Sequence, residues 1–165
     1  MKSRIRMLLA PVLTIVMMTA CGQEPELIQF RKSIDEFCTK VSEIDTAINS
    51  IDAQASDATA QLLSCLDELD MVFKSFAGLD FPEEFDYLEA LADESSEYMT
   101  EAVSSYHMAY SNNSYNEYTA EYAKENYSRA YKRVQIIIAF LHGDVPDDAD
   151  LTVEHSDHND APDNS

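Results

Sequence analysis

Histidine and serine are the first side chains to consider for chemistry in this chain, because together with a carboxylate they can form an activated nucleophile. Ser104 precedes His107 by three residues, which places both side chains on one face of a helix. No Asp or Glu lies three or four residues from His107, so only an acid distant in the sequence could orient its imidazole. We therefore expect no catalytic residues here or elsewhere in the chain.

Metal-binding chemistry would need clustered carboxylates and histidines. Di-iron helical bundles use a Glu-x-x-His motif on two helices, and the sequence contains no such motif. Rows of acids at helical spacing are better explained as solvated faces: Glu94, Glu97, Glu101, Glu117, Glu121 and Glu125. His155 and His158 lie among acids and could hold a divalent cation loosely, although ordering a disordered segment would weaken its affinity. We expect no metal site and no cofactor.

A row of aromatic and basic residues in the last predicted helix is the candidate binding surface. At about 100° per residue its members share one flank: Tyr115, Tyr118, Tyr122, Arg129 and Arg133. Tyrosine and arginine are favoured in binding surfaces, so this flank could receive a ligand or partner. Alternatively, a helix in a four-helix bundle contacts two neighbours and needs a wide apolar face, with its arginines paired to surface acids.

The elements that would position these residues are helices. Apolar residues recur at three- and four-residue spacing from 27 to 76 with almost no break. A single helix over 25–77 would be about 80 Å long and would lack a partner over half its length. A break near 50–57 instead gives two helices, 25–50 and 55–77, with Gly78 as a C-cap.

Two further helices follow in the second half of the chain. Asp80 with Glu83, and Ser114 with Glu117, have the spacing of a capping box and predict starts for helices 82–111 and 114–142. Gly143 then ends the last helix. The sequence thus predicts an all-α fold, an antiparallel up-down four-helix bundle over residues 25–142.

The first 21 residues have the organisation of an export signal. A basic segment, residues 1–6, precedes an apolar run, residues 7–18, which is too short to span a bilayer. The following Met18-Thr19-Ala20-Cys21 resembles the lipobox of bacterial lipoproteins. The resemblance implies that residues 1–20 are a cleaved signal peptide and that Cys21 carries a lipid, with 21–24 as a linker. It also implies an extracytoplasmic location and a membrane anchor made by acyl chains.

Lipidation of Cys21 would leave Cys38 and Cys65 as a pair, which can be oxidised outside the cytoplasm. A hairpin centred between Ile51 and Asp52 brings these two cysteines to the same height. We therefore expect a disulfide that clips the first helix to the second. The alternative is two small thiols packed in the core.

Charge restricts the class of partner. The net charge is −20, and all 31 acidic but only 8 of 11 basic residues follow Cys21, so cleavage would leave 8 − 31 = −23. Such a field repels phosphate backbones, so we expect no nucleic-acid partner, and it favours cations or a basic partner. Residues 143–165 contain eight acids, no base and two prolines, and we expect a disordered tail.

Together these features predict a lipid-anchored lipoprotein whose bundle is a non-catalytic interaction or structural module of the cell envelope. Its partner would be an envelope or extracellular protein. The alternative function is binding of a small molecule or cation, which requires a cavity lined by tyrosines of the last helix. A closed core with no cleft near Tyr118 and Arg129 would instead favour the interaction module.

Overall fold

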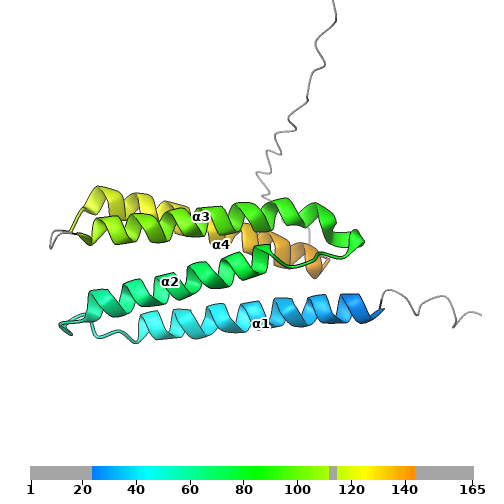
Figure 1. Ribbon diagram of the computed structural model, residues 1–165, viewed down its shortest axis with the longest axis horizontal. Coiled ribbons are helices and arrows are strands. Elements are labelled where there is room, and N and C mark those ends of the chain that lie inside the picture. The colour runs from blue at the N-terminus through cyan, green and yellow to red at the C-terminus, as the bar shows by residue number, and fades with distance from the viewer. Residues whose placement is uncertain (1–23, 112–114, 144–165) are drawn as a thin grey trace, which may run out of the picture.

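The structure, a computed structural model, describes residues 24–111 and 115–143. These residues form four α-helices and one short 3-10 helix, with no strand among them: α1 (Glu24–Asn49), α2 (Ala58–Ala77), η1 (Glu83–Leu88), α3 (Glu89–Ala109) and α4 (Glu117–Leu141). Successive helices run in opposite directions along one long axis (Figure 1). The predicted all-α, antiparallel four-helix bundle is confirmed. The signal-peptide residues, Cys21, Ser114, His155 and His158 lie outside the described residues.

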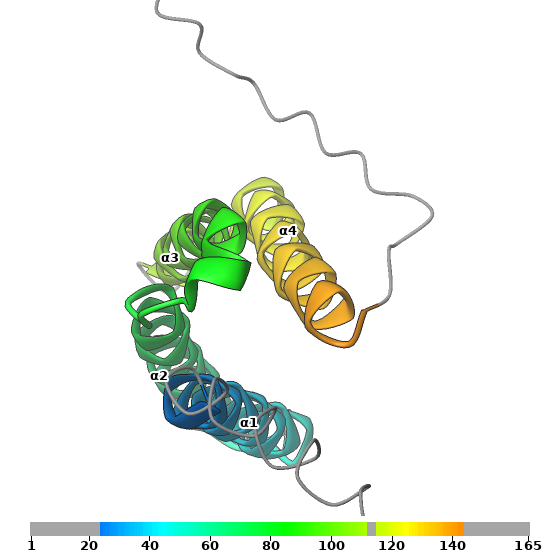
Figure 2. The same cartoon turned by 90° about the vertical axis from the view of Figure 1, so that its right-hand side faces the viewer.

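The helices are arranged in an arc. Viewed along the bundle, α1 lies beside α2, α2 beside α3, and α3 beside α4 (Figure 2). The most extensive packing is between α3 and α4, where small residues face each other and allow the backbones to approach closely: Ala92, Ser95, Ala102, Ala109, Ala120, Ala123 and Ala130. No helix among the described residues is both long and apolar enough to cross a membrane.

Aromatic side chains fill the core between α1 and α2. Phe37 of α1 stacks on Phe76 of α2, with ring centroids 4.2 Å apart, and meets Phe73 edge-on at 5.4 Å. Phe30 contacts Phe81 in the segment that leads into η1. Phe30, Phe37 and Phe76 are buried members of the apolar pattern predicted over residues 27–76, whereas Phe73 and Phe81 were not part of it.

The predicted break near 50–57 is confirmed, since α1 ends at Asn49 and α2 begins at Ala58. The turn between them uses side-chain chemistry in place of glycine or proline: the Asp52 carboxylate accepts a hydrogen bond from the Gln54 N–H at 2.9 Å. The predicted centre of the hairpin was wrong. Phe37 packs against Phe73 and Phe76, and the midpoints of these two contacts, residue 55 and the boundary between residues 56 and 57, lie beyond the boundary between residues 51 and 52.

This register explains why the predicted disulfide is absent. Cys38 and Cys65 are both free, half-buried thiols. Phe37 lies between Phe73 and Phe76, so Cys38 is level with residues 72–75. Cys65 is therefore at least 72 − 65 = 7 residues away along α2, which corresponds to about 10 Å or more at the helical rise. A disulfide requires Cα atoms about 4.4–6.8 Å apart, so the alternative of two core-facing thiols applies.

The helix ends confirm one predicted cap and differ from the prediction at the start of two other helices. Gly78 caps α2, as expected, because its N–H bonds to the carbonyls of Lys74 and Phe76. Residues 83–88, predicted as part of one helix over 82–111, form a separate 3-10 helix that follows Pro82 without any side-chain cap from Asp80. The cap of α4 is Asn116, whose side chain accepts the Thr119 N–H at 3.1 Å. Gly143, with a φ of 82°, follows the end of α4.

Candidate functional site

The predicted aromatic and basic flank of α4 is divided between two environments, and its arginines face α3. The Arg133 Nε donates to the Glu94 carboxylate at 2.6 Å. The guanidinium carbons of Arg129 and Arg133 both lie 5.7 Å from the centre of the Tyr98 ring. Arg129 also pairs with Glu125 at 3.8 Å. These arginines are therefore engaged in holding α3 and α4 together, as the packing alternative anticipated.

The tyrosines of the flank lie at the other end of α4 and are open to solvent. Tyr118 is 87% exposed and Tyr122, one turn later, is 46% exposed. We call these two residues the tyrosine face. The exposed acids Glu117, Glu121 and Glu125 lie on the same helix beside them. An exposed aromatic pair beside a row of carboxylates is suited to contact with a positively charged surface.

A cavity of about 330 Å³ lies at the same end of the bundle, lined by residues near the C-terminal ends of α1 and α3 and in the N-terminal halves of α2 and α4. Four tyrosines line it: Tyr106, Tyr110, Tyr115 and Tyr127. Its apolar wall comes from Ile48, Leu62 and Leu66 on α1 and α2. All four helices therefore contribute to this tyrosine cavity. Sequence reasoning placed only Tyr115 in a binding surface, because the other three tyrosines come together only when α3 packs on α4.

Two phenol groups of the tyrosine cavity, those of Tyr106 and Tyr127, have raised pKa values. Burial, followed by the neighbouring Tyr110, Tyr115 and Glu121, raises the pKa of Tyr106. Burial is also the main reason that the pKa of Tyr127 rises to about 12. Only two charged residues line the cavity, Glu121 and Lys124, whose charged groups are 4.0 Å apart and largely exposed. The cavity thus combines aromatic walls with one ion pair at its rim.

A second tyrosine cluster joins α1 to α4. Tyr131 donates to the Asp45 carboxylate at 3.1 Å, and the Tyr127 hydroxyl lies 3.3 Å from the same oxygen. The two tyrosine rings stack with centroids 4.7 Å apart. Burial is the first cause of a strongly raised pKa at Tyr131. The sequence signal for this link was Asp45, an acid next to the core residue Ile44, but its partner could not be identified without the packing of α4.

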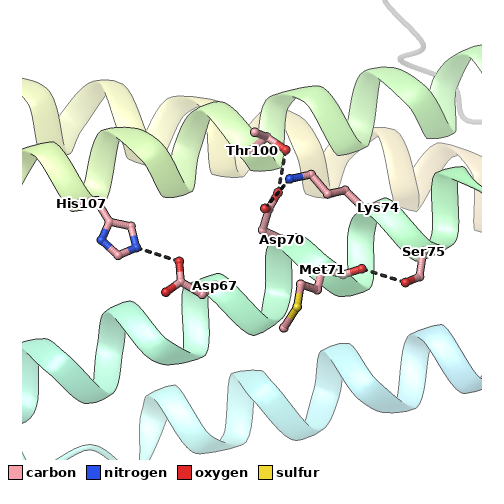
Figure 3. Close-up of polar contacts among 7 residues, drawn as sticks. All are labelled: Asp67, Asp70, Met71, Lys74, Ser75, Thr100 and His107. Carbon is pink, nitrogen blue, oxygen red and sulfur yellow. Dashed lines mark hydrogen bonds and ion pairs between the residues drawn. The ribbon is translucent and has the colours of Figure 1, made fainter.

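His107 does have a distant acid partner, and Figure 3 shows the contact. Its Nε2 lies 2.7 Å from the Asp67 carboxylate of α2. Further along the same α2–α3 surface, Thr100 donates to Asp70 at 2.6 Å, and Lys74 pairs with Asp70 at 2.7 Å. Ser104 and His107 are not joined by a hydrogen bond within the described part of the chain. The geometry therefore connects two helices and does not assemble a nucleophile.

The groove between α1 and α2 and the possible metal ligands offer weaker candidates for a functional site. A groove of about 680 Å³ runs along the outer side of α1 and α2, with Phe37, Val72 and Phe76 at its base. The lysines along its α1 side already pair within that helix, Lys32 with Glu36 and Lys40 with Glu43. No group of three metal-ligating side chains occurs in residues 24–111 and 115–143.

No protein-family model, curated protein or solved structure matches this chain. The candidate site is therefore defined by its own geometry, which consists of an exposed tyrosine face and a tyrosine-lined cavity at one end of a helical bundle.

Proposed function

We propose that this protein is a lipid-anchored, extracytoplasmic lipoprotein whose bundle is a non-catalytic module that binds a basic protein of the cell envelope. The anchor is inferred from the lipobox-like residues 18–21. The described helices include none that could cross a membrane, so the proposed attachment depends on the lipid at Cys21.

The observation that supports the interaction is the tyrosine face. Large aromatic side chains lose apolar exposure and little conformational entropy when a partner covers them, which is why they concentrate in interfaces. Tyr118 protrudes from α4 with 87% of its surface exposed. The arginines of the same flank, which would suit an anionic partner, are engaged with Glu94 and Tyr98 of α3.

Charge indicates the chemistry of the partner. The exposed glutamates beside the tyrosine face and the net charge of −20 would attract a lysine- or arginine-rich surface and speed its encounter. Phenol rings can also accept cation–π contacts from arginine side chains. A basic protein surface fits both properties of this face.

Site-specific crosslinking tests this proposal. A photo-reactive amino acid at Tyr118, in a bacterial host that exports the protein, should yield one main adduct with a basic envelope protein. Tyr122→Ser or the pair Glu117→Lys and Glu125→Lys should reduce that adduct, and so should high salt. Probes at Ile28 and Met71, exposed apolar residues on α1 and α2, serve as controls. The same adduct from all three positions, or none from Tyr118, would contradict the proposal.

The proposed anchor has a separate test. Radioactive palmitate fed to the host should label the protein, and Cys21→Ala should abolish the label. The variants Cys38→Ala and Cys65→Ala should remain labelled, because these thiols lie within the bundle. Equal labelling of the Cys21→Ala variant would exclude lipidation at this position.

A second candidate function, binding of a small molecule or cation, is favoured by one specific observation. The tyrosine cavity has a volume of about 330 Å³, at the lower end of the range typical of small-molecule sites. It contains Tyr115 and Tyr127 but neither residue of the tyrosine face. The two surfaces therefore can be tested independently.

A further inference from the structure

The tyrosine cavity brings together an unusual density of one side-chain type. Tyr106 comes from the last turn of α3 and Tyr110 is the C-cap of that helix, while Tyr115 precedes α4 and Tyr127 lies within it. Tyr110 and Tyr115 contact each other with ring centroids 5.3 Å apart and an interplanar angle of 46°. Tilted rings of this kind form the walls of a concave, aromatic surface.

The charges around these rings favour a cation. The face of each phenol ring carries the negative part of its quadrupole, which attracts ammonium groups. The pKa values of Tyr106 and Tyr127 are raised above the ordinary tyrosine value, mainly by burial, so both phenols hold their protons more tightly than usual. The acidic residue Glu121 lines the same cavity. The whole chain adds a net charge of −20.

We propose that the tyrosine cavity binds a small organic ammonium ion, held by cation–π contacts with Tyr106, Tyr110 and Tyr115 and by the carboxylate of Glu121. Lys124 also lines the cavity, and its ammonium group is 4.0 Å from the Glu121 carboxylate. Lys124 is therefore an internal competitor, which the bound ion displaces from Glu121. This inference rests on the second candidate function, small-molecule or cation binding, and is separate from the proposed partner binding, since neither Tyr118 nor Tyr122 lines the cavity.

The position of the cavity in the bundle indicates where the ion comes from. The N-terminal end of α1, three residues after Cys21, is at the opposite end of the bundle (Figure 1). The 26 residues of α1 span about 40 Å at 1.5 Å per residue. A lipid on Cys21 would thus leave the cavity far from the headgroups of the anchoring membrane along this axis. A dissolved ammonium ion fits this placement better than a membrane-embedded headgroup.

Calorimetric titration of the full chain in a non-ionic detergent tests the proposal with four soluble compounds. Tetramethylammonium and choline should bind in a saturable, one-to-one manner. The uncharged isostere of choline, 3,3-dimethylbutan-1-ol, has the same shape and should bind at least about tenfold more weakly, because it lacks the cation–π and carboxylate attraction. Glycerophosphocholine represents a lipid headgroup and should bind no more tightly than choline.

Four variants identify the residues responsible. Tyr106→Leu should abolish choline binding, whereas Tyr106→Phe, which keeps the ring, should retain it. Glu121→Gln should weaken binding severalfold, and Lys124→Gln should strengthen it, because these changes remove an attraction and a competitor. Glu125→Gln is the matched control: it removes the same charge one turn along α4, outside the cavity lining, and should leave choline affinity unchanged.

Several results would overturn the proposal. Equal affinity for choline and its uncharged isostere would show that the cavity recognises shape alone, and absence of saturable ammonium binding would exclude the site. Tighter binding of glycerophosphocholine would assign the cavity to a headgroup. Since Tyr106→Leu can also disturb packing, thermal unfolding of each variant is measured, and the opposite signs expected for Glu121→Gln and Lys124→Gln at exposed positions do not depend on folding.

Discussion

At the scale of single residues, one carboxylate on α1 links this helix to α4, the helix at the other end of the arc (Figure 2). Asp45 accepts the Tyr131 hydroxyl at 3.1 Å and lies within 3.3 Å of the Tyr127 hydroxyl. Both phenols are partly buried, and burial favours their uncharged forms. Deprotonation would place a second negative charge beside Asp45, so the cluster is stable only while the phenols keep their protons.

This cluster predicts a specific loss of stability in alkali. The pKa of Tyr127 is about 12 in the folded protein and 10.0 for an unperturbed tyrosine, so the folded state holds the proton more tightly. Its contribution is fully present below pH 10.0 and is lost as pH rises through about 12. Thermal unfolding of Tyr127→Phe should therefore show a smaller decline over this range than the unmodified protein. Tyr118→Phe, at an exposed position, is the control, and an identical decline in all three proteins would contradict the assignment.

Two buried serines lower stability. The hydroxyls of Ser95 and Ser105 face the α3–α4 packing and have no hydrogen-bond partner within the described residues. An unpaired buried hydroxyl costs free energy, and alanine is the better helix former, so Ser105→Ala should stabilise the protein by about 1 kcal/mol. Urea unfolding measures the change. Ser104→Ala, at the adjacent exposed position, should raise the free energy of unfolding only by the difference in helix propensity between alanine and serine. A larger effect for Ser104→Ala than for Ser105→Ala would refute the explanation.

The position of a residue around its helix was easier to predict from the sequence than the residues that it contacts on other helices. The helical angle placed Tyr118 and Tyr122 on one flank because it depends only on their spacing, whereas Tyr115 precedes α4 and lines the cavity instead. It could not show that Arg133 meets Glu94, since that contact depends on the height of α3 relative to α4. The acid partner of His107 was missed for the same reason, because Asp67 is 40 residues away in the sequence.

At the scale of elements, α4 depends on a cap that the sequence did not single out. Asn116 accepts the Thr119 N–H at 3.1 Å, and its own N–H donates to the Ala109 carbonyl at 2.9 Å. Asn116→Ala should lower the free energy of unfolding by about 1 kcal/mol, because a donor in the first turn loses its acceptor. Asn116→Asp keeps an acceptor and should retain most of the stability. Equal losses in both variants, measured by urea unfolding, would show that the side-chain cap is unimportant.

The helices themselves followed from periodicity, but the register of the first hairpin did not. When two antiparallel helices both carry apolar residues at three- and four-residue spacing, these residues can be paired in several alternative registers. The pattern therefore does not fix the centre of the hairpin. The turn lacks the glycine or proline that would have located it, and uses Asp52 instead. The packing of large aromatic side chains sets the register of the hairpin, because the Phe37 ring lies between Phe73 and Phe76. In this register Cys38 is not level with Cys65.

At the scale of the whole molecule, the proposed sites share one end. The tyrosine face and the tyrosine cavity lie near the loop between α3 and α4, opposite the N-terminal end of α1 (Figure 1). An anchor at Cys21 would present both toward the medium. The sequence placed a candidate binding surface on α4, but it could not indicate the cavity, which is built by side chains from all four helices.

The sequential arc of helices also has a consequence for how the chain folds. Each large interface joins helices that are consecutive in the sequence, so contacts form by closing short loops, a topology associated with rapid folding. The link from Asp45 to Tyr127 and Tyr131 spans more than 80 residues and should form last.

Asp45→Ala should accordingly accelerate unfolding, by roughly five- to thirty-fold for a loss of 1–2 kcal/mol, and leave the folding rate nearly unchanged. Stopped-flow kinetics in urea measures both rates. Asp35→Ala makes the same substitution at an exposed position of α1 and should alter neither rate by a comparable factor. A slower folding rate in Asp45→Ala would place the α1–α4 link in the folding nucleus. With that link formed late, α1 becomes the part of the bundle that detaches most often in the native state and exchanges its amide hydrogens first.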